Sequence, residues 1–78
     1  GQTTIAYKLP QAASVELTIY NMAGQRIKNV VDKKQSAGRH QVFWDGTDED
    51  GRRVGSGVFF CRLSTDIQGQ TRRMVLIR

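Results

Sequence analysis

Residues 38 to 60 constrain the fold of this chain more than any other stretch. An alternating apolar run ends there at Trp44, an acidic turn containing Gly46 and Gly51 follows, and a second apolar run begins near Gly57. Asp-Gly pairs supply backbone angles that other residues resist, so this pattern indicates a turn between two antiparallel strands. The stretch contains no catalytic grouping. It predicts a β-module whose function is something other than chemistry.

Period-two alternation recurs along the rest of the chain, whereas no window has apolar residues at helical spacing bounded by caps. The expected strands are residues 4–9, 14–20, 25–32, 39–44, 57–65 and 70–77. A polar loop is expected at 33–38, and a short seventh strand can form around Arg53 and Val54. Strands at this spacing predict an all-β fold, an antiparallel sandwich or small barrel of six to seven strands.

The same alternation predicts which side chains face the core. In the strand at 14–20 the inward positions are Val15, Leu17 and Ile19, with Glu16 and Thr18 facing outward. Ile27 and Val31 are the inward residues expected in the next strand, and the turn at 21–24 uses Gly24 for a positive φ.

In the strand at 57–65 the inward set is Phe59, Cys61 and Leu63, because the opposite choice would bury Arg62 without a partner. Trp44 allows two interpretations. An exposed indole stacks on sugars, whereas a buried one closes an end of the core and bonds its N–H; burial is favoured in a chain with one Trp.

Size and charge limit the possible functions. Seventy-eight residues predict a single domain, 1–78, of modest stability. The net charge is +5, and four of the seven acids lie in the turn at 45–50, so the remaining surface is strongly basic. A basic surface can attract nucleic acid, anionic glycan or lipid, but it is more often only solvated. No basic helix or interleaved aromatic pattern supports a nucleic-acid partner.

Cysteine use and hydropathy exclude further classes. Cys61 is the only cysteine, which leaves no internal disulfide and no zinc ligand set, and a buried thiol is expected. No apolar run is long enough for a membrane span, and the first residues do not resemble a signal peptide, so we expect an excised module of a longer protein.

The acidic turn is the one candidate metal site, with Asp45, Asp48 and Asp50 as possible calcium ligands. Its spacing does not fit an EF-hand loop, because Ser56 stands eleven positions after Asp45. The favoured alternative is that these carboxylates bond their own backbone in Asx-type turns. We therefore expect no metal and no cofactor. His40 has no nucleophile pattern near it and is expected to be solvated or at a strand edge.

Four segments, taken in order and spacing, resemble one family: Thr3-Thr4-Ile5 with Lys8-Leu9-Pro10, Val15-Glu16-Leu17-Thr18-Ile19-Tyr20-Asn21 with Gly24-Gln25-Arg26, Ala37-Gly38-Arg39-His40 with Trp44-Asp45-Gly46, and Gly55-Ser56-Gly57-Val58-Phe59 with Arg73-Met74-Val75-Leu76. That family is the C-terminal sorting-type domain of secreted bacterial proteins, close kin to the immunoglobulin-like domain of the flagellar hook-capping protein. The resemblance implies an immunoglobulin-like β-sandwich, outside the cell or on its surface. It also implies that the basic-apolar tail carries a type IX export signal or partner site, formed by Arg72, Arg73, Met74, Val75, Leu76, Ile77 and Arg78.

The first functional hypothesis is therefore a non-catalytic C-terminal module that directs export or surface attachment of an upstream protein. Its partners would be the upstream domains and the outer-membrane secretion machinery. The alternative is an assembly module that packs against identical subunits or a neighbouring domain in a filament or cap. A carbohydrate-binding module using Trp44 is a weaker third, and an enzyme is the least supported.

Overall fold

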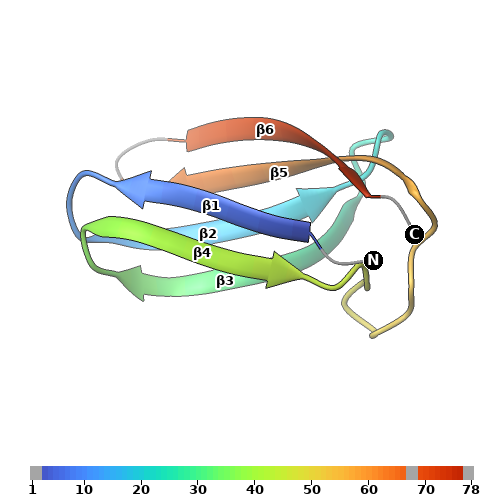
Figure 1. Ribbon diagram of the computed structural model, residues 1–78, viewed down its shortest axis with the longest axis horizontal. Coiled ribbons are helices and arrows are strands. Elements are labelled where there is room, and N and C mark those ends of the chain that lie inside the picture. Colours follow the sequence, from blue (N-terminus) through green and yellow to red (C-terminus); the bar gives the residue numbers. More distant parts are fainter. Residues whose placement is uncertain (1–2, 67–68, 77–78) are drawn as a thin grey trace.

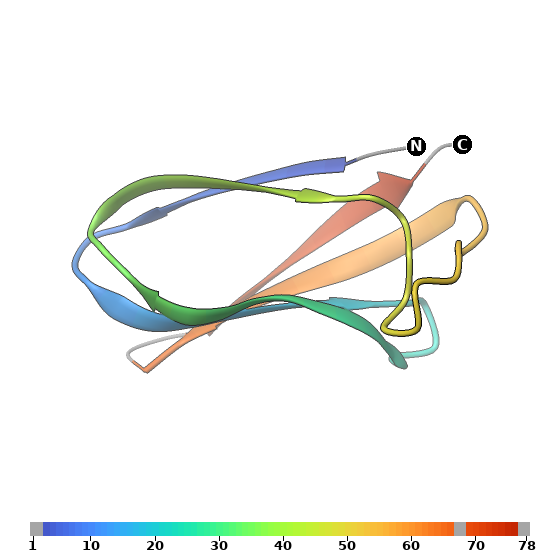
Figure 2. The same cartoon turned by 90° about the horizontal axis from the view of Figure 1, so that it is seen from below.

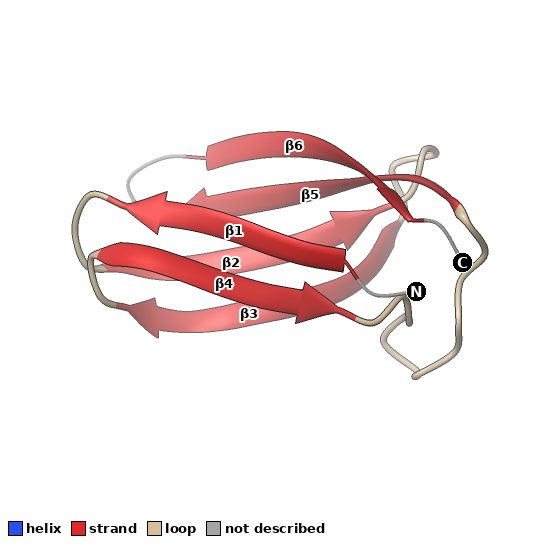
Figure 3. Cartoon of the chain, in the orientation of Figure 1, coloured by secondary structure: helices blue, strands red, loops and turns tan. Residues whose placement is uncertain are grey.

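The computed structural model describes residues 3–66 and 69–76, and this part of the chain is built from antiparallel strands (Figure 3). In chain order the strands are β1 (Thr3–Leu9), β2 (Ala13–Tyr20), β3 (Arg26–Gln35), β4 (Gly38–Trp44), β5 (Gly57–Thr65) and β6 (Gly69–Leu76). The expected all-β, antiparallel class is confirmed.

The strands form two sheets that lie face to face. One sheet has two strands, β1 and β4, and the other has four strands in the order β3-β2-β5-β6. Figures 1 and 2 show β1 and β4 as one layer over the other four strands. The layers form a sandwich and not a barrel, with a two-stranded layer over a four-stranded one.

Two sequence expectations about the strands are wrong. β3 continues through Gln35, beyond the expected end at Asp32, because its polar end pairs with the start of β2, Ala13 opposite Gln35. No seventh strand forms around Arg53 and Val54: Arg53 makes only an isolated bridge to Thr47. Positive φ angles at Gly46 (78°) and Gly51 (79°) fold this segment into a compact loop instead.

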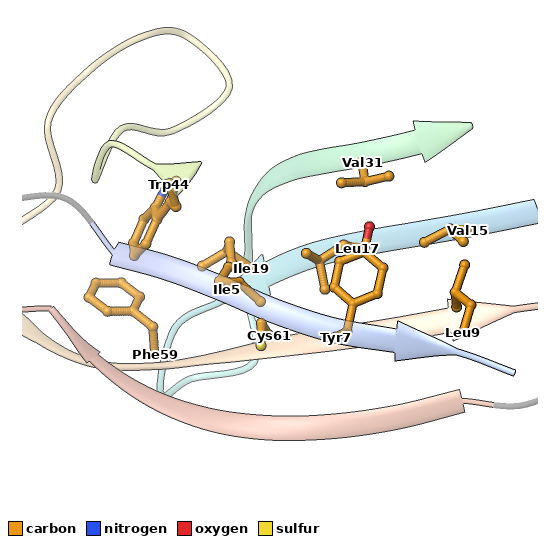
Figure 4. Packing of buried hydrophobic residues seen from close by; sticks show 10 residues of the cluster. All are labelled: Ile5, Tyr7, Leu9, Val15, Leu17, Ile19, Val31, Trp44, Phe59 and Cys61. Carbon is orange, nitrogen blue, oxygen red and sulfur yellow. The ribbon is translucent and has the colours of Figure 1, made fainter. Parts of the chain in front are cut away.

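The core lies between the two layers (Figure 4). Alternate residues of β1, β2 and β5 fill it, and Ile19 and Leu17 are essentially inaccessible to solvent. Burying each large side chain contributes about 1.5–3 kcal/mol, so the interior accounts for most of the favourable energy of folding. The core cluster is Ile5, Tyr7, Leu9, Val15, Leu17, Ile19, Val31, Trp44, Phe59 and Cys61. The predicted inward sets are confirmed, with Ile27 and Leu63 half-buried against this cluster.

Trp44 is buried, as the sequence predicts, with 1% of its surface exposed. Its indole meets the Phe59 ring edge to face, with 5.1 Å between ring centroids. The indole Nε1 donates a hydrogen bond to the carbonyl oxygen of Thr47 at 2.9 Å. Trp44 thus closes one end of the core and ties the following loop to it, so its ring is not available to stack on a sugar.

Thr18 departs from the prediction that it faces solvent. It lies on the outer side of β2, but only 3% of it is exposed. Asn29, its partner on β3, donates from Nδ2 to Thr18 Oγ1 at 3.0 Å and to the Leu17 carbonyl oxygen at 3.4 Å. Register shifts between β2 and β3 on either side of this pair mark bulges in β3, which place Asn29 over Thr18.

Replacing Trp44 with Phe tests how much this end of the core contributes. The variant loses ring volume and the donor to Thr47, and we expect the free energy of unfolding to fall by about 1–3 kcal/mol. The adjacent Phe43 is 56% exposed and is a matched control: Phe43→Leu should change stability by less than about 0.5 kcal/mol. Urea unfolding measures both, and equal losses would contradict the assigned burial.

Gly38 begins β4 with a φ of 118°, which residues with a Cβ resist. Gly38→Ala meets no neighbour within 4 Å, so its cost would be backbone strain alone, about 1–3 kcal/mol. Gly55→Ala, where the added Cβ is equally unobstructed and φ is not positive, is the control and should be close to neutral. Thermal unfolding of the two variants compares them, and a neutral Gly38→Ala would refute the strain.

Candidate functional site

The acidic turn is held by its own carboxylates. Asp45 Oδ1 accepts hydrogen bonds from the Thr47 amide at 3.1 Å and the Thr47 hydroxyl at 2.5 Å. Asp48 Oδ1 accepts from the amides of Asp50 and Arg52, both at 2.9 Å. These are the Asx-type turns that the sequence predicts as the alternative to a calcium site.

Asp45, Asp48 and Asp50 are close in the chain, but the geometry does not gather them around one point. Within residues 3–66 and 69–76, no group of three His, Cys, Asp or Glu side chains is placed to hold a metal ion. The Lys28 ammonium lies 3.8 Å from Asp45. The Thr47 hydroxyl and, less strongly, Lys28 lower the pKa of the Asp45 carboxyl. This carboxyl thus stabilises the fold above its ordinary pKa, and the contribution disappears on acidification.

Glu49 covers an exposed sheet edge, a role that sequence reasoning missed. β3 is an outer strand of the four-stranded sheet, and the Glu49 amide donates to the Ile27 carbonyl oxygen on it at 3.1 Å. The Glu49 carboxylate accepts from the Asn29 amide at 2.5 Å and lies 3.7 Å from the Arg26 guanidinium. The loop therefore satisfies backbone groups that would otherwise invite another strand. The contact depends on the bulges in β3, and the sequence pattern does not reveal those bulges.

The basic residues Lys28, Lys33, Lys34 and Arg39 do not all lie together. Lys28 is half-buried and donates to Thr47 Oγ1 at 2.9 Å, so it belongs to the acidic loop. Lys33 and Lys34 lie at the far end of β3, and Arg39 lies on β4 in the other sheet. His40 is half-exposed, stacks on Tyr7 and places Nε2 2.7 Å from the Ser36 carbonyl oxygen. No charge cluster suited to nucleic acid emerges from these positions.

The predicted tail site lies mostly on β6, whose backbone pairs with β5, from Cys61 opposite Arg72 to Gly57 opposite Leu76. β6 is an outer strand of its sheet. The side chains of Arg72, Arg73, Met74, Val75 and Leu76, and all of Ile77 and Arg78, lie outside the described residues, so their role in export or partner binding stays a prediction.

Among the residues whose side chains are described, large apolar groups are exposed at two places on opposite layers. Met22, in the β2–β3 turn, is 70% exposed, and Phe43, on β4, is 56% exposed. Met22 borders a groove of about 450 Å³ that is lined by Tyr20, Asn21, Met22, Gly24, Phe60 and Arg62. Sequence alternation separates Phe60 from the core but does not show that Phe60 and Tyr20 meet, because that depends on the β2–β5 register.

No helix in the described part of the chain is long and apolar enough to cross a membrane.

Removing the Glu49 carboxylate tests the covered edge. In Glu49→Ala the backbone amide of Asn29 loses its acceptor, so the hydrogen exchange of that amide should accelerate several-fold. The free energy of unfolding should fall by about 0.5–1.5 kcal/mol. Glu49→Gln keeps an acceptor oxygen and should lie closer to the parent. Asp50→Ala, the exposed neighbour, is the control and should leave Asn29 exchange unchanged. Unaltered exchange in Glu49→Ala, measured by NMR, would show that the contact does not protect this edge.

Comparison with known proteins agrees with this architecture. FlgD from P. aeruginosa has a structure that superposes with a TM-score of 0.78 at 25% sequence identity, over 96% of this chain and 58% of that one. The present chain thus spans little more than half the length of that FlgD chain. PorZ, a surface component of the type IX secretion system of Porphyromonas gingivalis, superposes with a TM-score of 0.60 at 19% identity, over 96% of this chain and 11% of PorZ; this likeness concerns the fold alone.

A search among curated protein sequences found no match. The family model of the FlgD Ig-like domain matches residues 1–70, which is almost the whole chain. Two antiparallel layers, a shared core and this match lead to one conclusion: the chain belongs to the FlgD Ig-like domain family.

Proposed function

We propose that this chain is a non-catalytic assembly module, an Ig-like domain that packs against a neighbouring protein subunit or domain. The observation that carries the proposal is the family match over residues 1–70, together with the structural likeness to FlgD across 96% of the chain. FlgD is a flagellar hook-capping protein. An assembly role follows from that kinship more directly than an export signal does.

The surface described above supports this proposal. Exposed apolar side chains lie on both layers, Met22 beside the four-stranded sheet and Phe43 on the two-stranded one. An exposed large apolar side chain is favourable where a partner covers it. A sandwich with exposed apolar side chains on opposite layers suits a module that lies between two neighbouring protein domains. Its working location would be outside the cell or on the cell surface.

The export role stays an open prediction. It depends on the tail from Arg72 to Arg78, and the likeness to PorZ is too distant to transfer a function. Deleting this tail would remove most of β6 and damage the sheet. The cleaner variant is the pair Arg72→Ala and Arg73→Ala in a reporter fusion, since it keeps the backbone pairing with β5. Export should be unchanged if assembly is the function.

Photocrosslinking in the cell that makes this chain tests assembly. A benzophenone amino acid would replace Met22 or Phe43, and Lys34, an exposed residue at the far end of β3, serves as the control. We expect a discrete crosslinked species from at least one of the two apolar positions and none from Lys34. If Met22 and Phe43 give no more product than Lys34, the assembly proposal is wrong.

A further inference from the structure

The groove beside Met22 has a defined place in the fold. Its floor is the outer face of the four-stranded sheet, where Tyr20 on β2 stands directly opposite Phe60 on β5. Both residues are only partly buried, so part of each remains accessible. Arg62, two positions along β5 on the same face, borders the groove, and the β2–β3 turn forms its wall. This face points away from the core described above.

The wall of the groove is held in one conformation. The Gly24 amide donates to the Asn21 carbonyl oxygen at 3.0 Å, and Gly24 has a φ of 80°. Asn21 Oδ1 also accepts from the amides of Ala23 at 3.0 Å and Gln25 at 2.9 Å. Met22 is therefore presented on an ordered turn, and a partner that uses it would not have to order the backbone first.

The composition of the groove is that of a protein interface. Aromatic residues, Met and Arg are enriched at protein–protein contacts, whereas Lys, Glu and Asp are depleted there. The described residues of the lining include two aromatic rings, one Met and one Arg, and no Lys, Glu or Asp is among them. A Met side chain is flexible and polarisable, so it adapts to the shape of a partner.

The charge of the groove indicates the chemistry of the partner that would bind there. The ion pairs within the described residues are Arg26–Glu49 and Lys28–Asp45, and neither involves Arg62. Arg62 is exposed, and among the described residues no acidic side chain lines the groove, so this cation lies beside an apolar floor without a described carboxylate partner. A carboxylate from outside would complete a charge-assisted hydrogen bond there.

A second copy of this chain is a poor occupant. Packing two grooves face to face would bring two Arg62 side chains together in a chain of net charge +5. The acidic loop of another copy is also poorly suited, because Asp45 and Asp48 accept bonds from their own loop and Glu49 binds β3. The remaining carboxylate, Asp50, has no large apolar side chain next to it in the sequence. Like charges brought together at an interface oppose association.

We propose that the groove formed by Tyr20, Met22, Phe60 and Arg62 binds a segment of a different protein that carries an apolar side chain next to a carboxylate. The apolar group would lie on the Tyr20 and Phe60 rings against Met22, and the carboxylate would pair with Arg62. This inference rests on the proposed assembly function and names the docking surface and the chemistry of the partner.

NMR titration of the whole chain tests the proposal. The probes are the peptides acetyl-Asp-X-Asp-X-Asp-amide, with X as Phe, Leu or Trp, and the same peptides with Lys in place of Asp. We expect the acidic peptides to shift the amide signals of Tyr20, Met22, Phe60 and Arg62, and the Lys peptides to bind at least about tenfold more weakly. Failure of every acidic peptide, or shifts centred on Lys33 and Lys34, would overturn the proposal.

Matched variants separate a specific site from general attraction to a basic chain. Arg62→Glu should weaken binding at least about tenfold, and Met22→Ser about threefold or more. The controls lie on the two-stranded layer: Arg39→Glu carries the same charge change, and Phe43→Ser removes a comparable exposed apolar group. If Arg39→Glu weakens binding as much as Arg62→Glu does, the attraction is non-specific and the proposal is wrong.

The oligomeric state completes the test. Light scattering should give a monomer mass across the concentration range, and a dimer abolished by Met22→Ser would make a second copy the occupant and overturn the proposal. The results also distinguish failure of the groove proposal from failure of the assembly proposal. Crosslinks from Phe43 without peptide binding would leave an assembly module that uses its other layer, whereas crosslinks from neither position would reject assembly itself.

Discussion

The fold depends on the packing of a two-stranded layer against the inner face of a four-stranded one. Neither layer is stable alone, since each presents a row of apolar side chains to the other. Ile5, Tyr7 and Leu9 of β1 meet Leu17 and its neighbours on β2, and the interior is closed at one end by the indole of Trp44 on Phe59. Because Trp44 also donates a hydrogen bond to the Thr47 carbonyl oxygen, the core is linked directly to the acidic loop.

Period-two patterning predicted the strand positions and the inward residues well, because burial of one face is a local property of a strand. Phe59 and Cys61 could be assigned to the core once Arg62 was placed outside. Burial of Trp44 at an end of the core was favoured on different grounds, because the chain has only one Trp. The turn at Asn21–Gly24 was equally accessible from sequence, since Asn and Gly have specific roles in such turns.

Features that depend on register could not be predicted. The bulges in β3 bring Asn29 over Thr18 and turn its amide toward Glu49, and no local pattern marks a bulge of this kind. The groove likewise requires Tyr20 to stand opposite Phe60, a pairing between strands forty residues apart. The acidic turn was predicted with two alternatives, and its local hydrogen bonds follow the Asx-turn form. The core residues could therefore be predicted from the sequence, whereas the candidate contact surfaces could be identified only in the structure.

The way β3 is covered also bears on how the domain can associate. An open strand edge can recruit any other extended chain, and the Glu49 contacts occupy part of this one. Association on this side of the domain therefore depends more on side chains of the sheet faces, where shape and charge discriminate between partners.

The lone thiol of Cys61 has a further consequence. It lies in the core with 4% of its surface exposed, and it is the only cysteine of the chain. A thiol reagent can reach it only when the two layers separate, so the modification rate measures how often the sandwich opens. Cys61 is thus a native probe of the transient separation of the two layers. A bound neighbour that holds the layers together would slow the modification of Cys61 without contacting the sulfur.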